Sequence, residues 1–230
     1  MPAKAGVMLT LHHLEYSQSF RILWLLEALG AEYELKCYNR NADDNLAPDE
    51  YKALSPLGTA PVVTDGDLVL CESNAIIDYI LDSYPDSDLR PGAGHKDRAR
   101  HLFWFHASPG SLMSLQGIAM VLGLLEMRSP WPISSLLKAV FGQVRKIFLG
   151  PRSSALIDLM EQDLGKQPFF GGDNLTAADI TLVYPMYAAL DKGQFEGRTN
   201  ILAWFARIEA LDSFKSARAK DDRERIIFKF

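Results

Sequence analysis

Two short polar stretches of the sequence have residue types that could hold a small ligand. In the first, Glu72-Ser73 follows an apolar run typical of a strand and precedes a helix predicted to begin at Asn74. A carboxylate attracts an ammonium group, and the free N–H groups at a helix N-terminus favour an anion. The pair therefore suits a ligand that carries both an ammonium and a carboxylate group.

The second stretch, Ser17 to Arg21, connects the first predicted strand to the first predicted helix. A hydroxyl at Ser17 lies near helix N–H groups that stabilise an adjacent anion. The alternative is a structural role, because serine is a preferred N-cap and Ser17 or Ser19 could simply cap the helix. Ser73 has the same alternative, with Glu72 as a solvated strand end. Spacing alone leaves both interpretations open.

Other kinds of reactive site are not indicated. The histidines are His12, His13, His95, His101 and His106. They share no metal-ligand spacing with one another or with the cysteines, so we expect no metal site. The sequence has no Gly-x-Ser-x-Gly elbow, no Walker loop and no Gly-x-Gly-x-x-Gly. Asp179 is predicted to form a capping box with Thr176 and needs no catalytic role.

Composition indicates an ordinary globular protein. The 230 residues are 48% hydrophobic, and their net charge of −5 comes from well-mixed signs. This balance argues against a nucleic-acid or anionic-membrane partner. We expect no signal peptide, and no apolar run reaches the ~20 residues of a membrane span. The isolated Cys37 and Cys71 fit a reducing compartment, so we expect a cytoplasmic protein.

The elements that position the two polar stretches form a compact α/β unit. The helix after Ser17 is apolar almost all round, so it must be covered on several sides. Pro61 stands at the first residue of a hairpin strand, a place where a sheet tolerates proline. The predicted elements are a strand over 7–11, a polar connection over 12–18, a helix over 20–29, a strand over 33–38, a helix over 49–54, a hairpin over 61–71 and a helix over 74–83.

After this unit the sequence has no strand signal, so the remainder is predicted to be all-α. The predicted helices are 95–127 with a bend at Pro109-Gly110, 135–148, 152–164, one that begins after Thr176, and 199–211. We therefore divide the chain into a first domain at 6–84, a linker at 85–94, a helical domain at 95–215 and a C-terminal tail at 216–230.

Four motifs in this order and spacing resemble the glutathione S-transferase family. They are Ser17-Gln-Ser-Phe-Arg-Ile-Leu-Trp-Leu-Leu-Glu, Pro56-Leu-Gly-Thr-Ala-Pro-Val-Val, Glu72-Ser-Asn-Ala-Ile and Gly172-Asp-Asn-Leu-Thr-Ala-Ala-Asp-Ile. The resemblance covers residues 7–212, and the placement of Ser17 is similar to that in theta- and delta-like serine classes. It implies a thioredoxin-like N-terminal domain, an all-helical C-terminal domain, and a cytosolic homodimer that detoxifies electrophiles.

The resemblance also implies roles for single residues. Pro61 is the family's cis-proline, and the Val62 main chain pairs with the cysteinyl part of glutathione. Glu72 and Ser73 take the γ-glutamyl ammonium and carboxylate groups. Ser17 donates a hydrogen bond to the glutathione sulfur.

Two departures from the family pattern give further expectations. Thr59, one of the expected glutathione-binding residues, stands where the family often has lysine or glutamine. The glycyl carboxylate of glutathione therefore needs another partner, for which Arg40 is our candidate. Tyr16 adjoins Ser17 and is the alternative catalytic residue. The missing cysteine at the start of the first helix disfavours thiol-transfer chemistry.

The implied reaction depends on the acidity of a thiol, because the thiolate is the nucleophile and a free thiol has a pKa near ~8.5. Lowering that pKa by ~2 units requires roughly 2.7 kcal/mol of thiolate stabilisation. One hydroxyl hydrogen bond to a charged acceptor contributes about 1.5–3 kcal/mol, and a helix N-terminus adds ~0.3–1 kcal/mol. These two effects suffice for the chemistry.

The predicted function is therefore a glutathione transferase with glutathione as co-substrate, a small apolar electrophile and no metal. A non-catalytic regulatory module of the same fold is one alternative. A glutathione-dependent peroxidase is another, because it uses the same thiolate.

Overall fold

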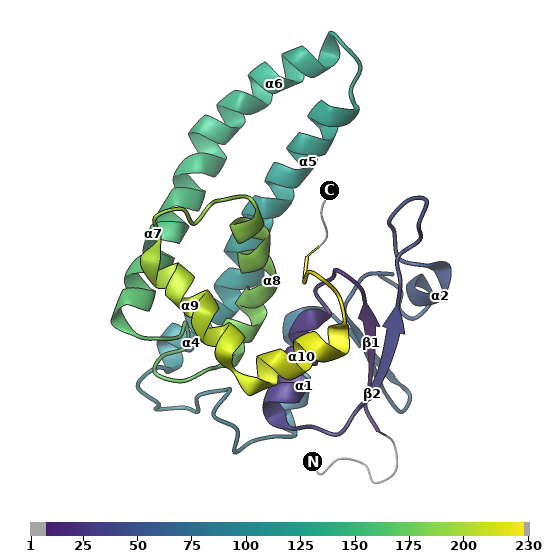
Figure 1. Cartoon of the computed structure of the whole chain (residues 1–230), viewed down its shortest axis with the longest axis vertical. Helices are drawn as coiled ribbons and strands as arrows, with labels where there is room; N and C mark the ends of the chain where they lie inside the picture. The colour runs from purple at the N-terminus through teal and green to yellow at the C-terminus, as the bar shows by residue number, and fades with distance from the viewer. Residues whose placement is uncertain (1–7, 228–230) are drawn as a thin grey trace.

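The computed structural model describes residues 8–227, which form a small sheet domain and a larger helical domain (Figure 1). The strands are β1 (Thr10–Leu14), β2 (Glu34–Tyr38), β3 (Val62–Asp65) and β4 (Leu68–Cys71), in the sheet order β2-β1-β3-β4. β1 runs parallel to β2 and antiparallel to β3, and a hairpin joins β3 to β4. This mixed sheet confirms the predicted thioredoxin-like architecture, and the short helix α2 (Asp49–Lys52) follows β2 as expected.

The first strand lies later in the chain than predicted. Its predicted start, Val7, and the start of the predicted first domain at residue 6 lie outside the described residues. β1 runs from Thr10 to Leu14, so His12 and His13 belong to the strand and not to a polar connection. Both rings are buried because each finds hydrogen-bond partners, and a pattern of apolar residues cannot register such polar positions.

Helix α1 (Phe20–Leu29) is covered on several sides, as its apolar surface predicted. Every residue from Phe20 to Leu26 is buried, and Gly30 ends the helix with a left-handed φ of 60°. α1 contacts α3 (Ser73–Asp82) in its own domain, and α8 (Ala177–Asp191) and α10 (Asp212–Asp221) from the helical domain. The first helix is therefore one of the elements that join the two domains.

The described residues after α3 form helices joined by irregular segments and contain no named strand. The remaining elements are α4 (Arg98–Ala107), the π-helical turn η1 (Ser108–Met113), α5 (Ser114–Arg128), α6 (Ile133–Val144), the π-helical turn η2 (Arg145–Leu149), α7 (Gly150–Lys166) and α9 (Thr199–Ala210). The capping box at the start of α8 is confirmed, because Thr176 accepts from Ala178 N–H and Asp179 from Thr176 N–H. The predicted bend at Pro109 takes the form of η1.

The predicted break at Gly150-Pro151 is wrong. Residues 133–166 form one continuous helical run, in which the π-helical turn η2 ends at Leu149 and Pro151 is the second residue of α7. Proline lacks an N–H group and clashes with the preceding turn of a regular α-helix. The wider π-helical turn before Pro151 accommodates the proline without ending the helix.

The segment predicted as a tail from residue 216 begins within α10. α10 continues to Asp221 and packs along α1, where Phe214 contacts the rings of Phe20 and Trp24 edge-on. Trp24 Nε1 donates to Ser213 Oγ over 3.2 Å. The residues 228–230 lie outside the described part of the chain.

The paired helices α5 and α6 project away from the rest of the molecule (Figure 1). Neither helix has a buried residue, and many of their apolar side chains are exposed. The continuous helical stretch Arg98–Arg128 is long and apolar enough to cross a bilayer by length and composition, against our expectation. One such helix is weak support for a membrane span, because an interface helix of a globular protein has the same composition.

Candidate glutathione site

The β4–α3 connection brings Glu72 and Ser73 to one edge of the sheet. Glu72 is exposed and has a φ of 76° and a ψ of 118°, a combination that residues other than glycine rarely adopt. Such strain persists where the surrounding structure fixes it and is frequent at ligand sites. Ser73 is the first residue of α3, so its hydroxyl lies beside the unpaired N–H groups of the first turn. This arrangement can hold an ammonium and a carboxylate side by side.

Two amide side chains connect this edge with the rest of the site. Gln18 Oε1 accepts from Arg21 Nη1 over 3.1 Å and lies 3.5 Å from Ser73 Oγ. Asn74 donates to a carbonyl of α4 and accepts from the Thr181 hydroxyl over 2.7 Å. The start of α1, the start of α3 and the helical domain therefore meet at one place.

The loop before α1 is fixed through its carbonyl groups. Tyr16 has a left-handed φ of 51°, and its carbonyl oxygen lies 3.4 Å from both Arg40 Nη2 and the Tyr184 hydroxyl. Arg40 also donates to the carbonyls of Glu15 and Asn45, and burial lowers the pKa of its guanidinium. Arg40 thus donates to main-chain carbonyls of this loop and of Asn45, whereas we expected it to bind the glycyl carboxylate of glutathione.

The Ser17 hydroxyl lies inside the protein, with 5% of the residue exposed. It donates to Leu14 O over 2.7 Å, accepts from Ser19 N–H over 3.2 Å, and lies 2.7 Å from Ser19 Oγ. Ser19 occupies the N-cap position without a side-chain cap bond, and its Oγ lies 2.8 Å from His13 Nδ1. Simple helix capping therefore does not describe this pair of serines.

Arg21 is a buried cation that the sequence analysis did not single out. Only 1% of the residue is exposed, its Nε has no partner among the described residues, and its terminal nitrogens contact Gln18 and Met113. Burial lowers the pKa of its guanidinium to about 9, and the ring of Tyr184 lies 5.8 Å away. A buried guanidinium without a carboxylate partner favours an anion in its neighbourhood.

The Ala60–Pro61 peptide bond is cis, the geometry that the resemblance implied. Val62 is fully buried inside the sheet, with β1 on one side and β4 on the other. Val62 lies in register with His12 of β1 and Cys71 of β4, and its main-chain contact with glutathione stays a prediction. Ala60 is half-buried, and no hydrogen bond of its main chain is found within residues 8–227, while Thr59 is exposed.

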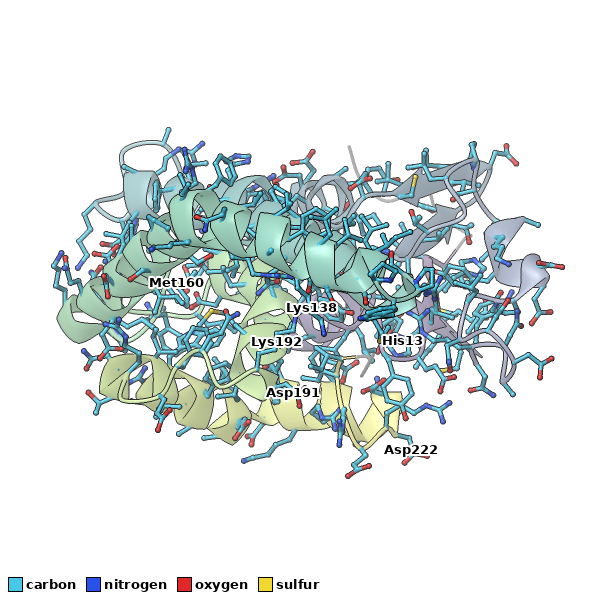
Figure 2. The ribbon with its side chains drawn as sticks, turned by 90° about the horizontal axis from the view of Figure 1, so that it is seen from above. His13, Lys138, Met160, Asp191, Lys192 and Asp222 are labelled. Carbon is cyan, nitrogen blue, oxygen red and sulfur yellow. The ribbon has the colours of Figure 1, made fainter. Side chains whose placement is uncertain are left out.

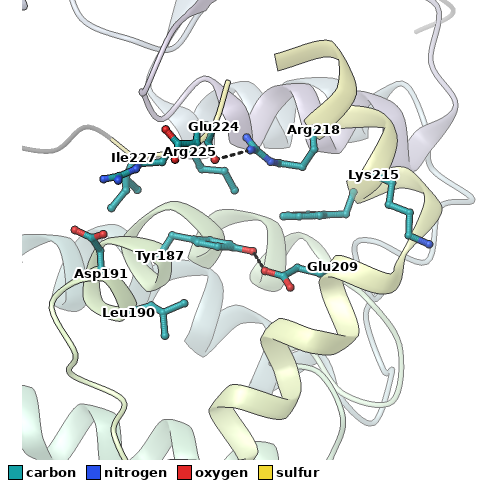
Figure 3. A pocket seen from close by; sticks show the side chains of 11 residues that line it. Tyr187, Leu190, Asp191, Glu209, Lys215, Arg218, Glu224, Arg225 and Ile227 are labelled. Atoms are coloured by element: carbon teal, nitrogen blue, oxygen red, sulfur yellow. Dashed lines mark hydrogen bonds between the residues drawn. The ribbon is translucent and has the colours of Figure 1, made fainter. Parts of the chain in front are cut away.

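Two cavities lie elsewhere in the helical domain. One of about 710 Å³ lies between α8, α10 and the segment after α10 (Figure 3), and one of about 500 Å³ lies between α5 and α7. The first carries acidic side chains from α8 and α9 and basic side chains from α10. Neither is lined by Ser17, Glu72 or Ser73. Within the described residues, no cluster of three or more His, Cys, Asp and Glu side chains could hold a metal ion.

Comparison with known proteins identifies the family. Residues 7–82 match the description "Glutathione S-transferase, N-terminal domain", and residues 151–212 match "Glutathione S-transferase, C-terminal domain". The chain is 32% identical over 182 residues to Glutathione S-transferase 3 of Schizosaccharomyces pombe, which covers 79% of this chain and 74% of that protein. The chain belongs to the glutathione S-transferase family. It is a transferase enzyme by this relationship.

Two further relatives cover nearly the whole transferase. Glutathione S-transferase 1 of Saccharomyces cerevisiae is 27% identical over 225 residues, which are 93% of this chain and 95% of that protein. The crystal structure of a glutathione S-transferase from Actinobacillus pleuropneumoniae superposes with a TM-score of 0.75 at 33% identity, covering 94% of this chain and 93% of the other. The fold of this transferase, including the helices between the two matched regions, is therefore shared with a solved relative.

The structure adds residues to the site that the sequence of the transferase did not reveal. Arg21 is part of a predicted helix, and its burial depends on Met113 and Tyr184, which are far away in the chain. Gln18 lies within the recognised motif, but nothing local shows its contact with Ser73. His13 was assigned to a polar connection, and no signal within that segment indicates its contact with Ser19.

Proposed function

We propose that this transferase joins the thiolate of glutathione to electrophilic carbons of small apolar molecules, and so contributes to their detoxification. One observation carries the proposal. The Ser73 hydroxyl at the start of α3 lies 3.5 Å from Gln18 Oε1, and Gln18 is the residue after Ser17. A tripeptide with a charged amino-acid end and a central thiol could therefore contact both the start of α3 and the Ser17 loop.

In the proposed complex the γ-glutamyl ammonium pairs with the Glu72 carboxylate. The γ-glutamyl carboxylate accepts from the Ser73 hydroxyl and the first N–H groups of α3. We place the main-chain contact of the cysteinyl part at Val62, the residue after the cis-proline Pro61. Thr59, exposed beside Ala60, is our candidate contact for the glycyl end. Arg40 holds the loop before α1 by donating to the carbonyls of Glu15 and Tyr16, and so helps to position Ser17.

In the proposed reaction Ser17 turns its hydroxyl from Leu14 O toward the sulfur. Catalytic hydrogen bonds in ligand-free enzymes are often made only in the complex. The N-terminus of α1 and the buried guanidinium of Arg21 add positive potential that favours the thiolate. The thiolate attacks the electrophilic carbon, and the leaving group departs with its electron pair. Tyr16 is the alternative donor, because its ring is half-buried and adjoins Ser17.

We also propose a homodimer in the cytoplasm. A large group of exposed apolar side chains on neighbouring helices usually marks an interface in a globular protein. The exposed apolar side chains on α5, α6 and their connection include Ile118, Val121, Leu125, Met127, Trp131, Ile133, Leu136 and Val140. A second copy of the chain would cover them, and sedimentation should show a dimer that Leu136→Glu weakens. Cys37 and Cys71 are free thiols, as a reducing compartment requires.

The direct test combines binding and turnover. We expect retention on immobilised glutathione and conjugation of glutathione to chlorodinitrobenzene. Retention without turnover on several electrophiles and hydroperoxides would favour the non-catalytic module. Turnover of organic hydroperoxides alone would favour the peroxidase. Loss of retention in Glu72→Gln, with normal retention in the hairpin variant Asp67→Asn, would assign the binding to Glu72 and the start of α3.

A further inference from the structure

A chain of polar groups leads from Ser17 into the protein interior. Ser17 Oγ lies 2.7 Å from Ser19 Oγ, which lies 2.8 Å from His13 Nδ1. The other ring nitrogen, His13 Nε2, lies 2.8 Å from Asp221 Oδ1. All four residues are at most 5% exposed, so water does not separate them. This series of hydrogen-bonded groups ends at Asp221 of α10, and Asp221 lies outside the matched family regions.

The position of hydrogens along this chain follows from its partners. A carboxylate only accepts, so the Asp221 contact requires a hydrogen on His13 Nε2. In neutral His13, Nδ1 is then an acceptor and takes the hydroxyl hydrogen of Ser19. The Ser17 hydrogen remains for two close neighbours, Leu14 O and Ser19 Oγ, each 2.7 Å away. Ser19 Oγ also lies 3.1 Å from Leu14 O. The two hydroxyl hydrogens therefore serve four contacts, and two contacts of hydrogen-bond length have no hydrogen.

A thiol placed at Ser17 would supply a third hydrogen to this network. Its proton passes to Ser17 Oγ while the Ser17 hydrogen moves to Ser19 Oγ and the Ser19 hydrogen moves to His13 Nδ1. The products are a thiolate and an imidazolium, so the total charge is unchanged. Each contact from the sulfur to His13 then contains one hydrogen, and each hydrogen points toward the thiolate.

We propose that His13, held by Asp221, receives the glutathione thiol proton through Ser19 and Ser17. This inference rests on the proposed function, because it needs the thiol at Ser17. His13 and Asp221 are positioning residues, since neither touches the substrate. Histidine suits the role because its two ring nitrogens can contact Ser19 and Asp221 at the same time. The Asp221 carboxylate stabilises the imidazolium and is itself held by Arg218 Nη1 over 2.6 Å.

The charged groups around His13 come from three elements. α10 contributes Asp221 and Arg218, and the segment after it contributes Arg223, which pairs with Glu15 at the end of β1. On β2, the Cys37 thiol lies in register with His13, and burial raises its pKa, which keeps it neutral near pH 7. Asp221 is therefore the acidic group in direct contact with the ring.

The test measures where the thiol proton goes. Thiolate formation on binding is followed by ultraviolet difference absorbance, and calorimetry in buffers of different ionisation enthalpy counts the protons released. In the wild-type enzyme we expect the thiolate to form with almost no proton release, because His13 keeps the proton. In Ser19→Ala the chain is interrupted, so we expect about one proton released per thiolate and a bound thiol pKa higher by about one unit.

Asp221→Asn is the second variant, and Asp222→Asn is its matched control. Asp222 is the next residue, is exposed, and has a left-handed φ of 49° that asparagine tolerates. Figure 2 shows Asp222 at the outer margin of the molecule and His13 well inside it. We expect Asp221→Asn to shift the pH profile of kcat/KM to higher pH and Asp222→Asn to leave it unchanged.

Two results would overturn the proposal. One is a wild-type enzyme that releases one proton per thiolate, as the Ser19→Ala enzyme does. The other is a nitrogen-15 spectrum in which His13 stays neutral when the thiolate is present. A wild-type enzyme that binds no glutathione would instead overturn the proposed function together with this inference.

Discussion

The two ends of the proposed glutathione site are built differently. At the Glu72 end an exposed carboxylate stands beside the start of α3, where the buried Ser73 and the unpaired first-turn N–H groups lie. At the Ser17 end the hydroxyl is buried and bonded to its own chain, to Ser19 and through it to His13. The proposed binding residues are therefore neighbours in the sequence, whereas the proposed chemistry depends on contacts between residues far apart in the chain.

At the sulfur end the buried His13 has a carboxylate partner, Asp221. Within residues 8–227 the buried His101 has no such partner, and we expect its protonation to have the largest effect on stability. His101 is 2% exposed, its Nδ1 has no partner among the described residues, and burial beside Arg98, His106 and Arg90 lowers its pKa to about 4. In the unfolded chain His101 binds a proton near pH 6.5, whereas in the folded chain it binds one only near pH 4. Stability is therefore complete above pH 6.5 and falls by about 3 kcal/mol as the pH drops to 4.

Urea unfolding across this pH range checks the prediction. His101→Gln should remove most of the loss, and His106→Gln, at an exposed position of the same helix, should not. If both variants keep the wild-type slope, the acid sensitivity belongs to other groups.

The Glu72 end of the site is tested by Glu72→Gln. A charge-assisted hydrogen bond contributes about 1.5–3 kcal/mol, so we expect glutathione affinity to fall by roughly 10- to 100-fold. kcat at saturating glutathione should change little, because the sulfur end is intact. Asp67→Asn removes a charge from the same hairpin and should behave as wild type. A fall in kcat with unchanged affinity would reverse the roles of the two ends.

The buried end is tested by Ser17→Ala. Removal of one hydroxyl bond to a thiolate should raise the pKa of bound glutathione by about 1–2 units, with glutathione affinity nearly unchanged. The pH profile of kcat/KM reports the shift. Tyr16→Phe is the control variant, and a shift in that variant alone would transfer the role to Tyr16.

The smallest expected effect concerns Arg21. Arg21→Met removes a buried guanidinium that lacks a carboxylate partner, so the folded state should be as stable as wild type or more stable. We expect the thiol pKa to rise by about half a unit, because Arg21 acts through potential rather than through a direct bond. Urea unfolding and thiolate titration measure the two effects. A less stable enzyme with an unchanged thiol pKa would make Arg21 purely structural.

The parts that the sequence predicted correctly have local causes. The hairpin follows from its alternation and turn, Gly30 ends α1 because it adopts a left-handed conformation, and Thr176 and Asp179 form a capping box within one turn. The Glu72 end of the site also has a local cause, since Glu72 and Ser73 are neighbours at a helix start. Local chemistry of this kind can be read from one segment.

The parts that the sequence did not predict depend on distant contacts. His13 is buried within a strand because Asp221, 208 residues away, bonds its ring. Arg21 is buried because Met113 and Tyr184 surround it. The continuous helix through Pro151 depends on a π-helical turn that propensity does not register. Such positions carry no signal until the fold has brought their partners together.

A crystal structure with bound glutathione tests the central claim most directly, because it places both ends of the ligand at once. The account predicts the sulfur within hydrogen-bond distance of Ser17 Oγ and the γ-glutamyl group between Glu72 and the start of α3. A sulfur bound to Tyr16 and turned away from Ser17, or a γ-glutamyl group far from Glu72, would contradict it.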